Sequence, residues 1–237
     1  MSYRGAIHCR RAVTLAAWLM AMGAGPAAQA IEFSTVVVDA GHGGNDNGAS
    51  RDGVRESQLT LKVAERLEAL LKKEGLKTAM TRRSDVFIAL GSRVEIANRY
   101  KSSIFVSIHF NSHPSSIHRG VETYYAGPAS LVLARSIQNK MVERLKTDNL
   151  GVKQRLDFKV LRETQSPAVL LECGFISNPV ERRLSQTEVY QKALTEAIRD
   201  GIMAVHEQPP GIFLRTYNAL LGWARHRVDQ LERYFRP

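Results

Sequence analysis

The feature that most constrains the fold is a buried-strand pattern that runs directly into a glycine-rich turn. Residues 36–38 are three valines, and consecutive β-branched side chains favour a strand that is covered on both faces. Four glycines between positions 41 and 48 then allow backbone conformations that other residues resist. His42 lies among them, where open α/β sheets place ligand and catalytic groups. An isolated turn histidine is more often a solvated loop residue than a ligand, so the rest of the chain must decide.

Strands and helices are expected to alternate after this turn, which is the pattern of a parallel α/β unit. We expect a single twisted, mostly parallel sheet of about six strands, flanked by helices on both faces. The expected strands are 35–39, 76–81, 104–108, 121–125, 158–161 and 168–171. The expected helices are 56–74, 90–100, 128–146 and 186–206.

Apolar spacing predicts which side of each helix meets the sheet. In the helix near 90–100, Leu90, Val94 and Ala97 are expected to face the core, and Arg93 is expected on the surface. In the last helix of the domain, Val189 begins the expected buried face.

Residues 1–30 have the pattern of a signal peptide. Three arginines precede an uncharged apolar run over 12–24, and Ala28-Gln29-Ala30 supplies a small-x-small cleavage pattern. The run is shorter than the roughly 20 residues of a membrane-spanning helix, although an uncleaved anchor is the alternative. No other stretch is long and apolar enough to span a membrane. We therefore expect export to the periplasm, or to the cell exterior if there is no outer membrane.

The remaining chain is expected to comprise a catalytic domain, 31–208, and a basic amphipathic helix, 209–237. The helix either packs on the domain surface or contacts a membrane or cell wall. The formal charge of the chain is +10, and removal of the signal peptide leaves 30 basic against 23 acidic residues, a net charge of +7. Such a surface suits an anionic partner. Export and the lack of a basic–aromatic motif argue against nucleic acid.

Four residues capable of metal binding or proton transfer are expected at one edge of the sheet. His42 follows the first strand, His109 ends the third, and Glu172 ends the last. Glu56 begins the first helix at the same edge. Two histidines and one carboxylate with an open position form a known catalytic zinc set, and a second carboxylate can then transfer protons. The chain lacks the compact His-x-x-x-His motif of most zinc peptidases.

Four short motifs, in this order, resemble the bacterial zinc-dependent N-acetylmuramoyl-L-alanine amidases, and the resemblance extends from about residue 34 to 206. They are DAGHGG at 39–44, ES at 56–57, SIHFN at 107–111 and ECGFISN at 172–178. The resemblance implies that one Zn²⁺ is bound by His42, Glu56 and His109, and that Glu172 is the catalytic acid/base. It implies hydrolysis of the amide between N-acetylmuramic acid and the L-alanine of the peptidoglycan stem.

Two further residues are candidates for supporting roles. Asn111 follows His109 closely and is expected to orient a ligand, and Arg93 is a candidate for contact with a substrate carboxylate or a ligand. Division-associated members of this family often carry a wall-targeting module, and some insert a helix that blocks the zinc site. The 62 residues between His109 and Glu172 leave little room for such a helix once strand, helix and strand are placed.

Three functions remain open from the sequence. The first is the amidase, acting in wall remodelling or daughter-cell separation. The second is a zinc peptidase that cuts within the stem peptide, and the third is a non-catalytic wall-binding protein. Peptidoglycan is the expected partner in each case, with an envelope activator protein as a possible second one, and the protein is expected to be a monomer.

Overall fold

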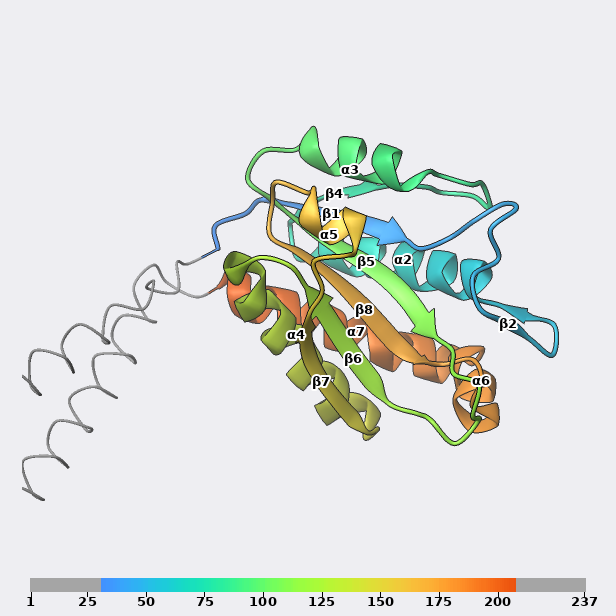
Figure 1. Cartoon of the computed structure of the whole chain (residues 1–237). Helices are drawn as coiled ribbons and strands as arrows, with labels where there is room; N and C mark the ends of the chain where they lie inside the picture. Colours follow the sequence, from blue (N-terminus) through green and yellow to red (C-terminus); the bar gives the residue numbers. More distant parts are fainter. Residues whose placement is uncertain (1–30, 208–237) are drawn as a thin grey trace, which may run out of the picture. The chain divides into compact units, whose positions relative to one another are not determined.

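The structure is a computed structural model that describes residues 31–207 (Figure 1). Six strands form one sheet in the order β4-β1-β5-β8-β6-β7. Neighbours are parallel except β6, which runs antiparallel to β8. The strands are β1 (Thr35–Ala40), β4 (Lys77–Met80), β5 (Ser103–Asn111), β6 (Val121–Tyr125), β7 (Asn149–Gln154) and β8 (Ala168–Phe175). The predicted α/β class, with a mostly parallel sheet of about six strands, is confirmed.

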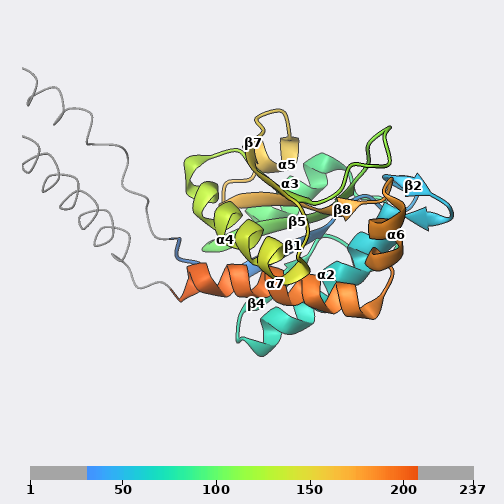
Figure 2. The same ribbon diagram turned by 90° about the horizontal axis from the view of Figure 1, so that it is seen from below.

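Helices cover both faces of this sheet, as Figure 2 shows. One face carries α2 (Glu56–Lys73), α4 (Pro128–Leu145) and α7 (Glu188–His206), which pack on the larger apolar core. Within residues 31–207, the opposite face carries only α3 (Leu90–Asn98) and α5 (Lys159–Arg162), over a smaller core. The short helix α6 (Pro179–Ser185) links β8 to α7, and β2 (Ser50–Arg51) pairs with β3 (Val54–Arg55) as a separate hairpin.

The elements around the first turn form for local reasons. Every residue of β1 is buried, as its β-branched sequence requires. Helix α2 has an acidic residue in its first turn and Lys72 and Lys73 in its last, which suits the helix dipole. Gly75 then adopts a left-handed φ of 81°, a conformation that favours glycine and ends the helix.

Several predicted element boundaries were wrong. Residues 158–161 were expected to form a strand, but α5 lies there, and the edge strand is β7. The helix expected over 186–206 is confirmed as α7, which the Thr187 side chain caps, but the short helix α6 before it, capped by the Asn178 side chain, was not predicted. Strands β5 and β8 continue to Asn111 and Phe175, so His109 and Glu172 lie within strands rather than at their ends.

Three expectations about helix faces were also wrong. Arg93 is buried, with 3% of its surface exposed, because its guanidinium reaches polar backbone groups beneath α3. Leu90 is 56% exposed at the first turn of α3, where the covering layer ends. Val189 is 81% exposed because it points away from the core at the start of α7.

The signal peptide predicted over 1–30 and the basic helix predicted over 209–237 lie outside the described residues. Between residues 31 and 207, no helix has the length and apolar character needed to cross a membrane. The 62-residue segment between His109 and Glu172 contains β6, α4, β7 and α5. Its long helix, α4, packs against α7, on the face of the sheet that α3 does not cover.

Candidate metal centre and active site

The four predicted chemical residues lie on or beside the thinly covered face, near the carboxyl ends of β1, β5 and β8. His42 follows β1, Glu56 is the first residue of α2, and His109 lies on β5. Glu172 lies on β8, in register with His109 on the neighbouring strand. Candidate ligand atoms of His42, Glu56 and His109 all lie within 4.8 Å of one another. The structure thus brings the predicted ligands together, while their metal-binding role stays a prediction.

The Glu56 carboxylate is the centre of this triad. Its Oε1 lies 3.1 Å from His42 Nε2 and 2.9 Å from His109 Nδ1. Backbone N–H groups of Phe110 and Ala49 donate to Oε1 and Oε2, at 3.0 and 2.8 Å, and fix the carboxylate. On the outer side, His42 Nδ1 lies 2.8 Å from Asp46 Oδ2. A carboxylate behind a histidine orients the ring, as is common in metal sites.

Two glycines are required for this close packing. A Cβ at Gly41 would lie 2.4 Å from the His109 imidazole, so only glycine lets the ring rest on the turn. A Cβ at Gly48 would lie 2.5 Å from Glu56 Oε2 and 2.6 Å from the His42 ring. His42 has a φ of 61°, a left-handed conformation that is uncommon for a residue with a side chain.

Hydrogen bonds and neighbouring charges set the charge states of Glu56 and His42. Burial alone would raise the pKa of Glu56, but hydrogen bonds and charge from His109 and His42 lower it well below its ordinary value. Burial opposes protonation of His42, but contacts with Glu56 and Asp46 raise its pKa overall. Glu56 is therefore ionised. Two imidazoles and a carboxylate fit the donor set that Zn²⁺ prefers.

Glu172 is in the opposite electrostatic state. Burial, followed by the negative charges of Glu56 and Glu122, raises its pKa well above the ordinary value. Its Oε2 atom is buried and has no hydrogen-bond partner within residues 31–207. A carboxyl group with a raised pKa in a cleft, beside a metal-binding set, is suited to taking up and returning a proton.

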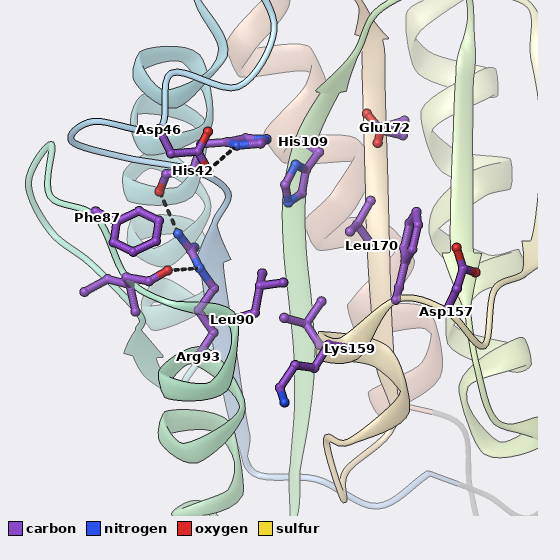
Figure 3. Close-up of a pocket in the computed structure, with 13 residues that line it drawn as sticks. His42, Asp46, Phe87, Leu90, Arg93, His109, Asp157, Lys159, Leu170 and Glu172 are labelled. Atoms are coloured by element: carbon purple, nitrogen blue, oxygen red, sulfur yellow. Dashed lines mark hydrogen bonds and ion pairs between the residues drawn. The ribbon is translucent and has the colours of Figure 1, made fainter.

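His42, His109 and Glu172 line one end of a cleft of about 580 Å³ (Figure 3). Phe87 and Leu90 line one side of the cleft, across from Leu170 on β8. Phe158, just before α5, and Val160 within α5 also line it. The lining is mainly apolar away from the triad. The cleft can therefore hold an extended substrate beside Glu172.

The two residues predicted for supporting roles contact different groups. Asn111 Nδ2 donates to Glu122 Oε1 at 2.8 Å, so Asn111 orients this second buried carboxylate. Arg93 lines the cleft, but its guanidinium donates to Asp39 and to backbone carbonyls that include that of His42. These contacts favour a positioning role over direct substrate contact, and both roles stay predictions.

Sequence reasoning missed Glu122, which is buried and lies in register with Glu172 on β6. Tyr124 and Lys153 also hydrogen-bond to its carboxylate. A glutamate within an otherwise apolar strand segment was the available signal, because such a residue is seldom buried without partners. Asp46 was missed as well, since its contact with His42 depends on the tight turn.

Known proteins share this fold and sequence. The family model for N-acetylmuramoyl-L-alanine amidase matches residues 36–204. A Bacillus subtilis protein named YqiI, itself uncharacterised, is 39% identical over 212 residues, covering 88% of this chain and 99% of the relative. The probable cell wall amidase LytH of Staphylococcus saprophyticus is 36% identical over 182 residues, covering 76% of this chain. The chain matches 60% of the length of that staphylococcal relative.

Solved structures of amidases also superpose on this chain. An N-acetylmuramoyl-L-alanine amidase from Clostridium difficile 630 superposes with a TM-score of 0.70 at 34% identity, covering 73% of this chain and 96% of the other. The catalytic domain of CwlV from Bacillus (Paenibacillus) polymyxa has a TM-score of 0.69 at 38% identity, with coverage of 73% and 97%. The CwlD amidase from Clostridioides difficile, solved in complex with the GerS lipoprotein, has a TM-score of 0.70 at 32% identity, with coverage of 73% and 98%.

Proposed function

Because the chain belongs to the N-acetylmuramoyl-L-alanine amidase family and is a peptidoglycan amidase, we propose that it is an exported, zinc-dependent enzyme. It hydrolyses the amide between the lactyl group of N-acetylmuramic acid and the L-alanine of the stem peptide. The observation that carries this proposal is that ligand atoms of His42, Glu56 and His109 lie close together, in register with a half-buried Glu172 whose Oε2 has no hydrogen-bond partner within residues 31–207.

The triad and Glu172 have different roles in the proposed reaction. His42, Glu56 and His109 hold one Zn²⁺, which when bound polarises the amide carbonyl and lowers the pKa of water. Glu172 accepts the proton of the attacking water and returns it to the departing alanine nitrogen. A C–O bond forms as the C–N bond breaks, so the products are a lactyl carboxylate and a free amine. The apolar cleft walls orient the substrate and limit competing water.

The cellular setting is a second part of the proposal. Residues 1–30 direct export to the periplasm, or to the cell exterior where there is no outer membrane, and the basic chain favours an anionic polymer such as peptidoglycan. The proposed role is wall remodelling or daughter-cell separation by a monomer. One related amidase was solved with a lipoprotein partner, which supports testing an envelope activator here.

The test is digestion of purified peptidoglycan by a chain that begins at residue 31, with products identified by mass. Free stem peptides that carry an N-terminal L-alanine support the amidase. Loss of the products with a chelator, and recovery with Zn²⁺, supports the metal requirement. Cleavage inside the stem would favour the zinc peptidase instead. Binding without release, even with zinc and envelope extract, would favour a wall-binding protein.

A further inference from the structure

Two buried arginines converge on the backbone that carries His42. Arg82 Nε donates to the Ala40 carbonyl and its Nη2 to the Gly41 carbonyl, both at 2.9 Å. Arg93 donates from Nη1 to the Ala40 carbonyl at 2.6 Å and from Nη2 to the His42 carbonyl at 2.7 Å. Three consecutive carbonyls, at residues 40–42, are thus bound by two guanidinium groups. Figure 3 shows the Arg93 guanidinium close to His42.

The same guanidinium groups tie this turn to the elements around it. Arg82 follows β4, and its Nη2 also donates to the Ser57 carbonyl at 2.7 Å, next to Glu56 at the start of α2. Arg93 lies on α3, and its Nε donates to the Ile88 carbonyl at 2.9 Å. The backbone around His42 and the backbone beside Glu56 are therefore joined through one side chain, Arg82.

Ion pairing alone does not explain why both arginines are buried. Each is only 3% exposed, yet Arg93 forms a salt bridge with Asp39 at 2.6 Å, whereas Arg82 forms none within residues 31–207. The bonds from Arg82 go to neutral oxygens, including Thr60 Oγ1 at 3.0 Å. Burial of a charge is costly unless many hydrogen bonds satisfy it. The contacts of Arg82 are concentrated on the carbonyls around the triad.

The turn needs such support because its backbone is strained. His42, Gly43 and Gly44 have successive φ values of 61°, 129° and 61°. A left-handed conformation at a residue with a side chain costs on the order of 1 kcal/mol and persists only where its surroundings fix it. The guanidinium forks are rigid and planar, so they hold carbonyl directions as well as positions.

We propose that Arg82 and Arg93 are positioning residues that fix the backbone of residues 40–42 and thereby hold His42 and Glu56 in the geometry that binds the metal. This inference rests on the proposed metal-binding role of the triad. In this role the arginines act through the backbone of residues 40–42 and are not metal ligands. Their effect is to reduce the reorganisation that metal binding would otherwise require.

If the two arginines acted through their charge, they would weaken metal binding instead of strengthening it. Two guanidinium groups and one carboxylate, Asp39, leave a buried net positive charge near the triad, which disfavours a bound cation. If charge dominated, removing an arginine charge would tighten metal binding, and lysine would leave the affinity unchanged. If the fork geometry dominates, lysine weakens binding although the charge is kept.

The experiment measures Zn²⁺ affinity by competition with a chromophoric chelator, for chains that begin at residue 31. Arg82→Lys and Arg93→Lys are each expected to weaken Zn²⁺ binding by roughly 10- to 100-fold, the usual effect of losing a group that orients a ligand. Arg199→Lys is the matched control, because Arg199 lies on α7 and pairs with Glu74 and Asp200 away from the triad. Its affinity should equal that of the wild type. Affinities of both test variants within twofold of the wild type, or tighter, would overturn the proposal.

A milder variant covers the case in which a lysine variant does not fold. Thr60 Oγ1 donates to the Gly41 carbonyl at 2.7 Å, and Thr60→Val removes this donor without changing charge. It is expected to weaken Zn²⁺ binding several-fold, and unchanged affinity would contradict the proposal. If the wild type binds no Zn²⁺, the metal proposal and this inference both fail. If the wild type binds Zn²⁺ and all the variants match it, only this inference fails.

Discussion

The two faces of the sheet are covered to different extents, and this difference locates the site. On one face α2, α4 and α7 cover the strands with a large, continuous apolar core. On the other face α3 and α5 cover only part of the strands, and the cleft lies where the cover ends. Adjacent residues of β8 show the contrast, since Leu171 packs in the larger core and Leu170 lines the cleft.

The ionisable residues of the site on β5, β8 and β6 all lie on the thinly covered face of the sheet. His109 on β5 is in register with Glu172 on β8, and Glu172 with Glu122 on β6. This row crosses the sheet on the thinly covered face and ends at Lys153 on the edge strand, which contacts Glu122. The fully covered face holds the larger apolar core, while the thinly covered face holds the ionisable groups of the site. Each prediction below tests this division.

The largest effect is expected from truncation in the larger core. Leu171→Ala should lower the free energy of unfolding by about 3 kcal/mol, because a fully buried leucine leaves a cavity. Leu170→Ala should cost at least about 1 kcal/mol less, because its space opens into the cleft. Urea denaturation of the two metal-free variants gives both values. Equal losses would mean that the two faces are equally packed.

Zn²⁺ binding should raise the free energy of unfolding through the triad on the cleft face. At free Zn²⁺ of 100 times the dissociation constant, the free energy of unfolding should rise by about 2.7 kcal/mol. Gly41→Ala should lose most of this gain, because the new Cβ would displace the His109 ring. Gly127→Ala is the control, since a Cβ there meets nothing within 4 Å. Thermal unfolding with and without Zn²⁺ tests both, and a full gain in Gly41→Ala would count against the triad.

The raised pKa of Glu172 predicts a pH-dependent stability of the metal-free protein. The folded state keeps the Glu172 proton at a pH where the unfolded chain has released it, so this carboxyl destabilises the fold as pH rises above about 4.3. Relative to Glu172→Gln, the wild type should lose about 1.4 kcal/mol per pH unit until the folded-state pKa is reached. At about pH 4 the two should converge. Melting temperatures of metal-free proteins between pH 4 and 8 test this, and a difference between the wild type and Glu172→Gln that does not change with pH would contradict it.

The smallest effect on stability is expected at the rim of the cleft. Phe87 is 53% exposed, so Phe87→Ala should change the free energy of unfolding by less than about 0.5 kcal/mol. Because Phe87 lines the cleft wall, the same change should raise KM for peptidoglycan fragments several-fold. Val189→Ala, at an exposed apolar residue outside the cleft, should change neither quantity. An unchanged KM for Phe87→Ala would exclude this wall from substrate binding.

Much of the fold follows from local sequence pattern, because its central strands are continuous runs of β-branched and other apolar residues. The convergence of His42, His109 and Glu172 follows from topology, since carboxyl ends of parallel strands meet at one edge. The edge strand β7 could not be predicted this way. Its residues are exposed or half-buried, so no alternating or continuous apolar pattern marks it.

The supporting residues of the site were harder to predict for a different reason. Arginines are mostly exposed, so Arg93 was placed on the surface. Its burial depends on Asp39 and on carbonyls from a segment about 50 residues earlier in the chain. Arg82 and Glu122 likewise depend on partners brought together by the tertiary fold. Local sequence identifies the metal-competent residues, whereas their support depends on packing between distant segments.

The most direct test of the account is the rate of stem-peptide release from peptidoglycan by Zn²⁺-loaded wild type and Glu172→Gln. The account predicts that the variant binds Zn²⁺ as tightly as the wild type but releases free stem peptides at least about 100-fold more slowly, the scale of losing a proton-transfer group. A variant that binds Zn²⁺ normally and retains the wild-type rate would contradict the proton-transfer role assigned to Glu172.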